Sequence, residues 1–235
     1  AAPAEGSDTP ETPAEEVLEQ ALAKSPGHLQ SALTLAGIKV AQKDFAGAEK
    51  LLRDAAAQAP NSVEPCMALA RFYAATGRPT EAESELNKAV KIDPNNGPSL
   101  LGLAALRYRA GKAGEAEEIY KRVSALPGQE FKPAYALYLL STNRTDLGIQ
   151  ELERLHKEFP RNRDIRDRLV AVYLATNRAT QAERVLDEAL RKNSKDFSAL
   201  LQRGALYVRT GRVPQAETDL NSAHQLEPES AEVHY

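Results

Sequence analysis

Apolar and small side chains recur at helical spacing along most of the chain, and residues 63–96 show the pattern most clearly. Within them, one set of side chains follows the i, i+3, i+4, i+7 spacing of a single helix face: Cys66, Met67, Leu69, Ala70 and Tyr73. Gly77 can adopt the positive φ that ends a helix, and Pro79 cannot continue that helix. The spacing therefore predicts a first amphipathic helix that ends near residue 77.

A second helix is predicted directly afterwards. Thr80 can cap its N-terminus, with Glu83 as the partner three residues on. The apolar stripe of this helix comprises Ala82, Leu86, Ala89 and Val90. Residues 93–96, Asp-Pro-Asn-Asn, supply turn chemistry at its end. The unit is thus a helical hairpin.

The hairpin repeats along the chain. Five segments share a turn followed by a small residue and an acid: 43–49, 77–83, 111–117, 177–183 and 211–217. They begin at intervals of 34, 34, 66 and 34 residues, and the long interval contains a weaker copy at 143–149. A 34-residue period with Ala near the start of the second helix resembles the tetratricopeptide repeat family.

That resemblance implies an all-α, right-handed superhelical solenoid of antiparallel helix pairs. Six full repeats are expected at about 29–62, 63–96, 97–128, 129–162, 163–196 and 197–230. A half repeat is expected at 14–28, and a truncated repeat at 231–235. Residues 1–13 are rich in Ala, Pro and acid, so they predict a disordered tail or linker.

The fourth repeat departs most from the pattern. Gly148 stands where the family has an alanine, and Pro133 falls at the start of its first helix. Because Pro is tolerated in a first helical turn, we expect a short helix that begins near Pro133. The chain also lacks the Trp that the family often has early in its first helix.

Charge and hydropathy limit the classes of partner that the chain can bind. The formal charge is −3, and residues 1–13 account for all of it, so the repeats are neutral. A neutral array argues against nucleic acid as a partner, because phosphate binding needs a basic stripe. The chain has no run of 18 apolar residues and therefore no predicted transmembrane segment.

The residues that could carry chemistry are few. The four histidines, His28, His156, His224 and His234, have no His or Cys at metal-ligand spacing, so no metal site is expected. Cys66 is expected to be a packed small hydrophobe. Recurrent Gly turns are explained as helix stops, and acidic first turns complement the helix dipole. We therefore predict no catalytic residues, no cofactor and no enzymatic activity.

The resemblance implies instead that the first helices line a concave groove. Carried onto this chain, the predicted partner-binding residues are Met67, Arg71, Leu101, Tyr108, Arg109, Arg168, Gln202 and Arg209. The family's Lys and Asn clamp for a peptide carboxylate is absent, since the ninth repeat positions are Gly37, Arg71, Ala105, Leu137, Ala171 and Ala205. An apolar groove with Tyr and Arg favours an amphipathic helix or an extended segment as the ligand.

The predicted function is that of a non-catalytic scaffold or adaptor, of bacterial type, that binds other proteins or peptides. One alternative is a structural module that self-associates end to end through its open repeat ends. Another is the repeat region of a larger envelope-associated protein for secretion or polysaccharide export, as in similar repeat lipoproteins. The compartment is open between the cytoplasm and an envelope-tethered, periplasmic location.

Overall fold

A computed structural model describes residues 14–25 and 27–228. These residues form thirteen α-helices and one short 3₁₀ turn, and they contain no β-strand. The fold is therefore all-α, as predicted. The predicted tail at 1–13 and the truncated repeat at 231–235 lie outside the described residues. The chain divides into two compact units, Ala1–Leu126 and Pro127–Tyr235.

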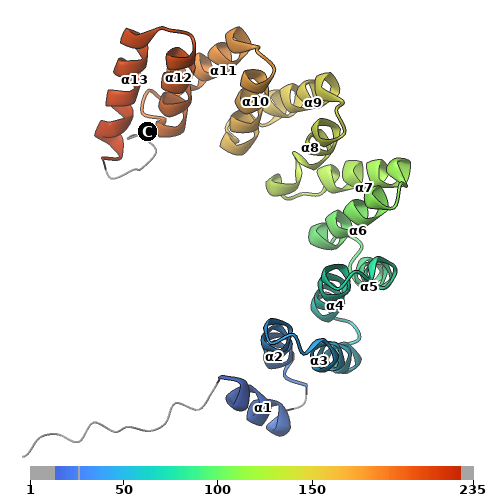
Figure 1. Ribbon diagram of the computed structural model, residues 1–235. Helices are drawn as coiled ribbons and strands as arrows, with labels where there is room; N and C mark the ends of the chain where they lie inside the picture. The colour runs from blue at the N-terminus through green and yellow to red at the C-terminus, as the bar shows by residue number, and fades with distance from the viewer. Residues whose placement is uncertain (1–13, 26, 229–235) are drawn as a thin grey trace, which may run out of the picture. The chain divides into compact units, whose positions relative to one another are not determined.

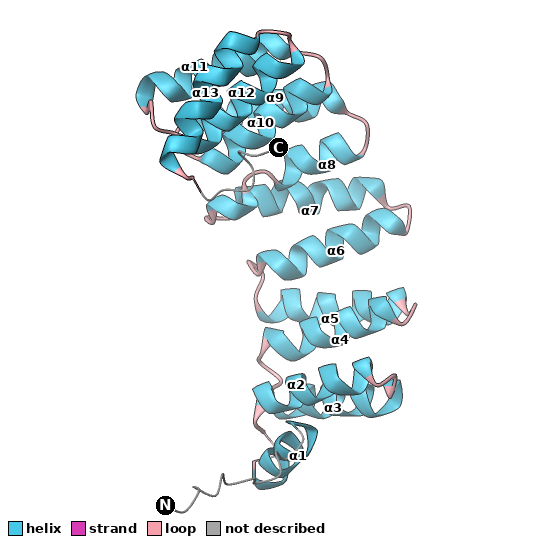
Figure 2. Cartoon of the chain, turned by 60° about the vertical axis from the view of Figure 1, so that its left-hand side comes forward, coloured by secondary structure: helices cyan, strands magenta, loops and turns pink. Residues whose placement is uncertain are grey.

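The first unit contains seven helices. They are α1 (Ala14–Lys24), α2 (Leu29–Ala41), α3 (Phe45–Gln58), α4 (Val63–Ala75), α5 (Pro79–Ile92), α6 (Gly97–Arg109) and α7 (Ala113–Ala125). The pairs α2–α3, α4–α5 and α6–α7 lie one after another within this unit (Figure 2). Each pair is one repeat, with a first helix and a second helix.

The second unit begins with the 3₁₀ turn η1 (Gln129–Phe131) and contains six helices. They are α8 (Ala134–Ser141), α9 (Thr145–Glu158), α10 (Arg163–Ala175), α11 (Ala179–Lys192), α12 (Phe197–Arg209) and α13 (Val213–Leu226). These helices pack as the pairs α8–α9, α10–α11 and α12–α13 (Figure 1).

Small residues let the two helices of a repeat approach closely. The family alanine of the second helix is buried in five repeats, at Ala48, Ala82, Ala116, Ala182 and Ala216. Leucines one turn further on, such as Leu52, Leu86 and Leu186, are buried as well. This i, i+4 stripe faces the core, as the sequence spacing predicts.

The turns inside the repeats all use a residue in the left-handed region. Gly77, Gly111 and Gly211 have φ values of 75°, 78° and 73°. Lys43, Asn143 and Asn177 take the same conformation at equivalent positions. Gly adopts this conformation without steric cost, and Asn does so more readily than most residues. The helix stop predicted at Gly77 is therefore present.

Side-chain caps are found on several first helices, although α4 and α8 have none. Asn96, Asn162 and Asp196 accept hydrogen bonds from the N–H groups of Ser99, Ile165 and Ala199. The predicted cap at Thr80 is wrong. Helix α5 begins at Pro79, and Arg78 precedes it without a side-chain cap. Because Pro lacks an N–H group and has a helical φ, it starts the helix without needing Thr80.

The fourth repeat is short, as expected. Helix α8 has eight residues and begins directly after Pro133. Gly148 of α9 packs against it so closely that an added Cβ would lie 2.7 Å from the Leu140 side chain. Leu140 thus occupies the space that the family alanine fills in the other repeats.

Polar clasps join successive repeats within each unit. The Tyr73 hydroxyl of α4 donates to Glu49 of α3 at 3.1 Å, and Arg78 pairs with the same carboxylate at 2.6 Å. The Arg78 guanidinium lies 4.4 Å from the Tyr73 ring centroid. Arg212 contacts Glu183 and the Tyr207 ring in the same way in the second unit. Hydrogen bonds from Arg78 hold the pKa of Glu49 below its usual range.

Candidate functional site

The predicted groove residues all lie on first helices. In the first unit, Met67 and Arg71 belong to α4, whereas Leu101, Tyr108 and Arg109 belong to α6. In the second unit, Arg168 belongs to α10, and Gln202 and Arg209 belong to α12. The surroundings of these side chains differ from one helix to the next.

Arg71 lines a pocket in the first unit between α2 and α4, which we call the α2–α4 pocket. Its volume is about 350 Å³. The lining is Leu33, Ala36, Gly37, Val40, Phe45, Leu52, Ala68, Arg71, Phe72, Ala75 and Thr76. Ten of these eleven residues are uncharged, and most are apolar. The pocket can therefore accept an apolar side chain.

Two large apolar residues of this pocket are unusually open to solvent. The exposed fraction of Phe45 is 47%, and that of Val40 is 37%. Phe45 is held in place by Phe72, with ring centroids 6.5 Å apart in a tilted arrangement. The opening arises at Gly37, because a Cβ built there would meet nothing within 4 Å.

Arg71 supplies the one charge among the lining residues. Its side chain is exposed, and it has neither a hydrogen bond nor an ion pair with any residue in the described part of the chain. An arginine at an apolar rim can form a charge-assisted pair with a carboxylate of a ligand. The pocket thus combines an apolar floor with a cationic edge.

The other predicted residues of the first unit are mixed in character. The Met67 sulfur accepts a hydrogen bond from Ser99 Oγ at 3.0 Å, and its side chain packs on the core. Leu101 is half-buried, whereas Arg109 is exposed. The exposed fraction of Tyr108 is 43%. Helix α6 therefore presents an aromatic and a cationic residue to solvent near its C-terminal end.

The predicted residues of the second unit are engaged within the protein. Arg168 pairs with Asp164 at 2.8 Å, and Arg209 donates to the Leu174 carbonyl at 3.3 Å. Gln202 donates to Ser198 Oγ at 3.2 Å, while its Oε1 is buried without a hydrogen-bond partner. These interactions reduce what the three side chains can offer to a partner.

Sequence reasoning missed the role of Val40 and Phe45 in the α2–α4 pocket. Gly37 was a signal for it, because Gly37 is the ninth residue of the first repeat, where the second repeat has Arg71. A glycine inside a helix costs about 1 kcal/mol relative to alanine. A glycine at this position can therefore mark a place where the helix surface is left open.

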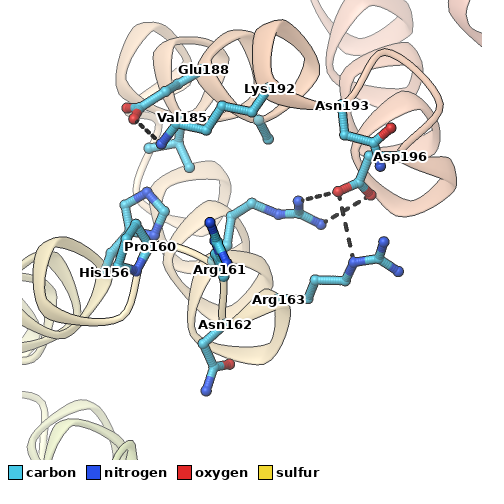
Figure 3. A pocket seen from close by; sticks show the side chains of 12 residues that line it. His156, Pro160, Arg161, Asn162, Arg163, Val185, Glu188, Lys192, Asn193 and Asp196 are labelled. Carbon is cyan, nitrogen blue, oxygen red and sulfur yellow. Dashed lines mark hydrogen bonds and ion pairs between the residues drawn. The ribbon is translucent and has the colours of Figure 1, made fainter.

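A second, polar pocket lies in the other unit, where the C-terminal end of α9, the start of α10 and the C-terminal half of α11 meet. We call it the α10–α11 pocket (Figure 3). Its lining is His156, Pro160, Arg161, Asn162, Arg163, Arg166, Val185, Glu188, Ala189, Lys192, Asn193 and Asp196. Figure 3 shows Val185, Glu188 and Lys192 on one helix above His156 and Arg161, with Asp196 to one side.

Arg166 is the unexpected residue of this pocket. It occupies the position of the buried Cys66 and Leu100, and its exposed fraction is 5%. Its guanidinium pairs with Asp196 at 2.6 Å and with Asp167 at 2.9 Å. Burial would raise the pKa of Asp196, but the hydrogen bonds from Arg166 and the Ala199 N–H outweigh it and hold the pKa below its usual value.

The residues that the structure describes contain neither a metal centre nor a membrane-spanning helix. Within the described ranges, no three His, Cys, Asp or Glu side chains come together as a metal centre would require. No helix in the described part of the chain has the length and apolar character needed to cross a bilayer. Cys66 is buried, and burial raises the pKa of its thiol.

Comparison with known proteins agrees with this architecture. The model of the family described as tetratricopeptide repeat matches residues 13–61, 39–98, 77–138 and 139–204. Since these matches span most of the sequence, the chain belongs to the tetratricopeptide repeat family. No curated protein is similar enough in sequence to count as a match.

Solved structures of tetratricopeptide repeat proteins share the fold. One from Parabacteroides merdae is 15% identical, with a TM-score of 0.53 over 94% of this chain and 88% of its own. The pilF protein of Pseudomonas aeruginosa is 17% identical, with a TM-score of 0.51 over 88% and 95%. A protein of Thermus thermophilus is 23% identical, with a TM-score of 0.51 over 68% and 89%. At these identities the likeness concerns the fold alone.

Proposed function

We propose that the chain is a non-catalytic scaffold that binds an apolar segment of a partner protein, either a helix or an extended peptide, on its first helices. Tetratricopeptide repeats are protein-interaction modules, and this supports the general class. The observation that carries the specific proposal is the α2–α4 pocket, with exposed Phe45 and Val40 around an apolar floor.

The chemistry of the pocket defines its ligand. A volume of about 350 Å³ is at the small end of the range for ligand sites, about 300–1,000 Å³. It suits one or two apolar side chains of a peptide. Burying one large apolar side chain contributes about 1.5–3 kcal/mol. The ligand therefore presents an apolar anchor to the floor of the pocket.

Arg71 favours a ligand that carries a negative charge. An acidic group beside the anchor would pair with its guanidinium, which has no partner among the described residues. We expect Leu101, Tyr108 and Arg109 of α6 to contact the same ligand where it runs on beyond α4. The proposed ligand is thus a segment with a large apolar residue next to Asp or Glu.

A displayed-peptide selection with the full chain as bait tests this proposal. The selected peptides should share a large apolar residue with a neighbouring acid. Their affinity, measured by fluorescence anisotropy, should fall at least about tenfold in Gly37→Leu, which fills the pocket from open space. Arg71→Ala should weaken binding of the acidic peptides by several fold.

The matched control is Gly114→Leu on α7, because that glycine also has nothing within 4 Å of its Cβ position and does not line the pocket. Both leucine variants should keep wild-type helicity by circular dichroism. The proposal fails if no peptide is enriched. It also fails if Gly37→Leu binds the enriched peptides as tightly as wild type does.

A second candidate function is end-to-end self-association. The terminal helices expose apolar residues, at Val17 of α1 and at Val208 and Val213 of the last described pair, with exposed fractions of 51%, 58% and 54%. Helix α1 has no buried residue of its own. Light scattering over a concentration series tests this reading. Growth beyond a dimer supports it, and a monomer at all concentrations rules it out.

A further inference from the structure

The α10–α11 pocket lies in the other unit from the proposed peptide site and calls for a different ligand. Its volume is about 180 Å³, and it is formed by α9, α10 and α11 together with the cap of α12. A space of this size holds one small group. Its chemistry is polar, unlike that of the α2–α4 pocket.

Positive charge exceeds negative charge in the lining. Four cationic side chains are present, Arg161, Arg163, Arg166 and Lys192, against the two carboxylates of Glu188 and Asp196. Lys192 is neutralised by Glu188 at 2.6 Å, and Arg166 by Asp196 at 2.6 Å. Two arginines therefore remain without a close carboxylate of their own.

Those two arginines are Arg161 and Arg163. Arg161 is exposed and forms no hydrogen bond or ion pair with the residues that the structure describes. Arg163 reaches Asp196 only at 3.8 Å, and that carboxylate already serves Arg166 and the Ala199 N–H. Both guanidinium groups can therefore donate hydrogen bonds to an anion that enters the pocket.

His156 adds a polar atom without a partner. Its Nδ1 is buried and has no hydrogen-bond partner in the described part of the chain. Buried nitrogen atoms of this kind are normally satisfied by protein, water or a ligand. Figure 3 shows the imidazole on the side of the pocket below α11, where Glu188 and Lys192 pair.

The repeat fold itself does not require this set of charges. The equivalent place in the first unit lies 100 residues earlier, where Ala56, Asn61 and Cys66 stand for His156, Arg161 and Arg166. The helices there have the same boundaries within the repeat. The first unit has cations of its own around Cys66, at Arg53, Lys88 and Lys91, but the three arginines at 161, 163 and 166 have no counterpart there.

We propose that the α10–α11 pocket binds a single oxyanion group, held by Arg161 and Arg163. The guanidinium fork pairs with phosphate and carboxylate oxygens in the same planar geometry. The group could reach the pocket as free inorganic phosphate or as the acidic side chain of a partner. Both sources share the chemistry, and the experiment distinguishes them.

The test uses NMR of the arginine Nε–Hε signals in the full chain at pH 7. One titration adds sodium phosphate, and another adds the blocked amino acid N-acetylglutamate amide, both at constant ionic strength set with chloride. The Arg163 signal should shift in a saturable way. Saturation by phosphate indicates a free ion, and saturation by the blocked glutamate alone indicates an acidic side chain.

Variants assign the effect to the pocket. Arg161→Gln should weaken the affinity about tenfold, since a hydrogen bond to a charged group is lost, whereas Arg161→Lys should retain most of it. Lys157→Gln removes one charge from an exposed residue of α9 that does not line the pocket, and it should bind as wild type does. The proposal is overturned if neither probe saturates, or if Arg161→Gln and Lys157→Gln have the same effect.

Discussion

Two equivalent places in the molecule, 100 residues apart, differ in how they fill the space between successive repeats. In the first unit, Cys66 is a buried thiol, and the next first helix is capped by Asn96. In the second unit, Arg166 takes the place of Cys66, and Asp196 takes the place of the capping Asn96. The helices at these places have the same bounds within the repeat in both units, but Cys66 and Asn96 are uncharged, whereas Arg166 and Asp196 form an ion pair.

This comparison shows how a helical repeat can tolerate a buried charge. A guanidinium with an exposed fraction of 5% needs a carboxylate, because an unpaired buried charge is very costly. Asp196 supplies that charge without a new structural element, since it also caps α12, as Asn96 caps α6 and Asn162 caps α10. The cap of α12 therefore has two partners, the Ala199 N–H and Arg166.

Removing the charge of the cap should have the largest effect. In Asp196→Asn the cap remains, because Asn caps a helix as well as Asp does, but Arg166 loses its main partner. We expect a loss of about 3 kcal/mol, since breaking a buried pair on one side leaves the other charge uncompensated. The measurement is hydrogen exchange of α10–α12 amides in the full chain, compared with amides of the first unit.

A double variant sharpens this prediction. Arg166→Leu with Asp196→Asn leaves both positions uncharged, as Cys66 and Asn96 are in the first unit, and its free energy of unfolding should lie within about 1 kcal/mol of the wild-type value. Asn96→Ala, a cap lost in the neutral unit, should cost only about 1 kcal/mol. Equal losses in Asp196→Asn and Asn96→Ala would show that the buried pair contributes nothing beyond the cap.

Gly148 offers a second comparison, of volume in place of charge. In α4–α5, Ala82 faces a first helix that carries Ala74, whereas in α8–α9 Gly148 faces Leu140 at the equivalent position. Gly148→Ala should destabilise the second unit by about 1 kcal/mol, because overpacking against Leu140 outweighs the gain in helix propensity. Urea unfolding followed by circular dichroism measures the change.

A double variant tests whether Gly148 and Leu140 share one space. Adding Leu140→Ala to Gly148→Ala should cost less than the sum of the two single changes, since the new methyl group occupies the space that Leu140 leaves. Additive losses would mean that the two residues do not share one space. Ala82→Gly serves as the reverse control and should also destabilise the protein, through lost helix propensity.

The smallest effect should appear on changing the pH. Burial lowers the pKa of His156 from its ordinary 6.5, so the unfolded chain binds the proton more readily than the folded one. The contribution of neutral His156 to the free energy of unfolding should be fully present above pH 6.5 and should be lost as the pH falls below that value. Among the neighbouring charges, Glu188 raises the pKa of His156, whereas Lys192 and Arg166 lower it.

The measurement is the free energy of unfolding between pH 7.5 and pH 5, with hydrogen exchange separating the two units. His156→Ala, which copies Ala56 of the first unit, should reduce the slope in the second unit. A slope that is unchanged in His156→Ala would assign the pH dependence to another group.

The sequence by itself determined the helix pairs and their period. The apolar spacing, the glycine turns and the alanine at each second helix are local signals, and local backbone preferences decide where such helices start and stop. The short helix after Pro133 followed from the same kind of signal. The prediction of a cap at Thr80 was wrong because Pro79 also favours a helix start, and the helix begins at Pro79, one residue before Thr80.

The tertiary structure alone decided which side chains meet across the repeats. Arg166 and Asp196 are 30 residues apart, and no local pattern states that a core arginine reaches the next cap. The opening at Gly37 likewise depends on the distance between α2 and α4. Of the eight predicted groove residues, the structure places Arg71 in a pocket, because a position in a repeat defines a helix face but not what neighbouring repeats leave open on it.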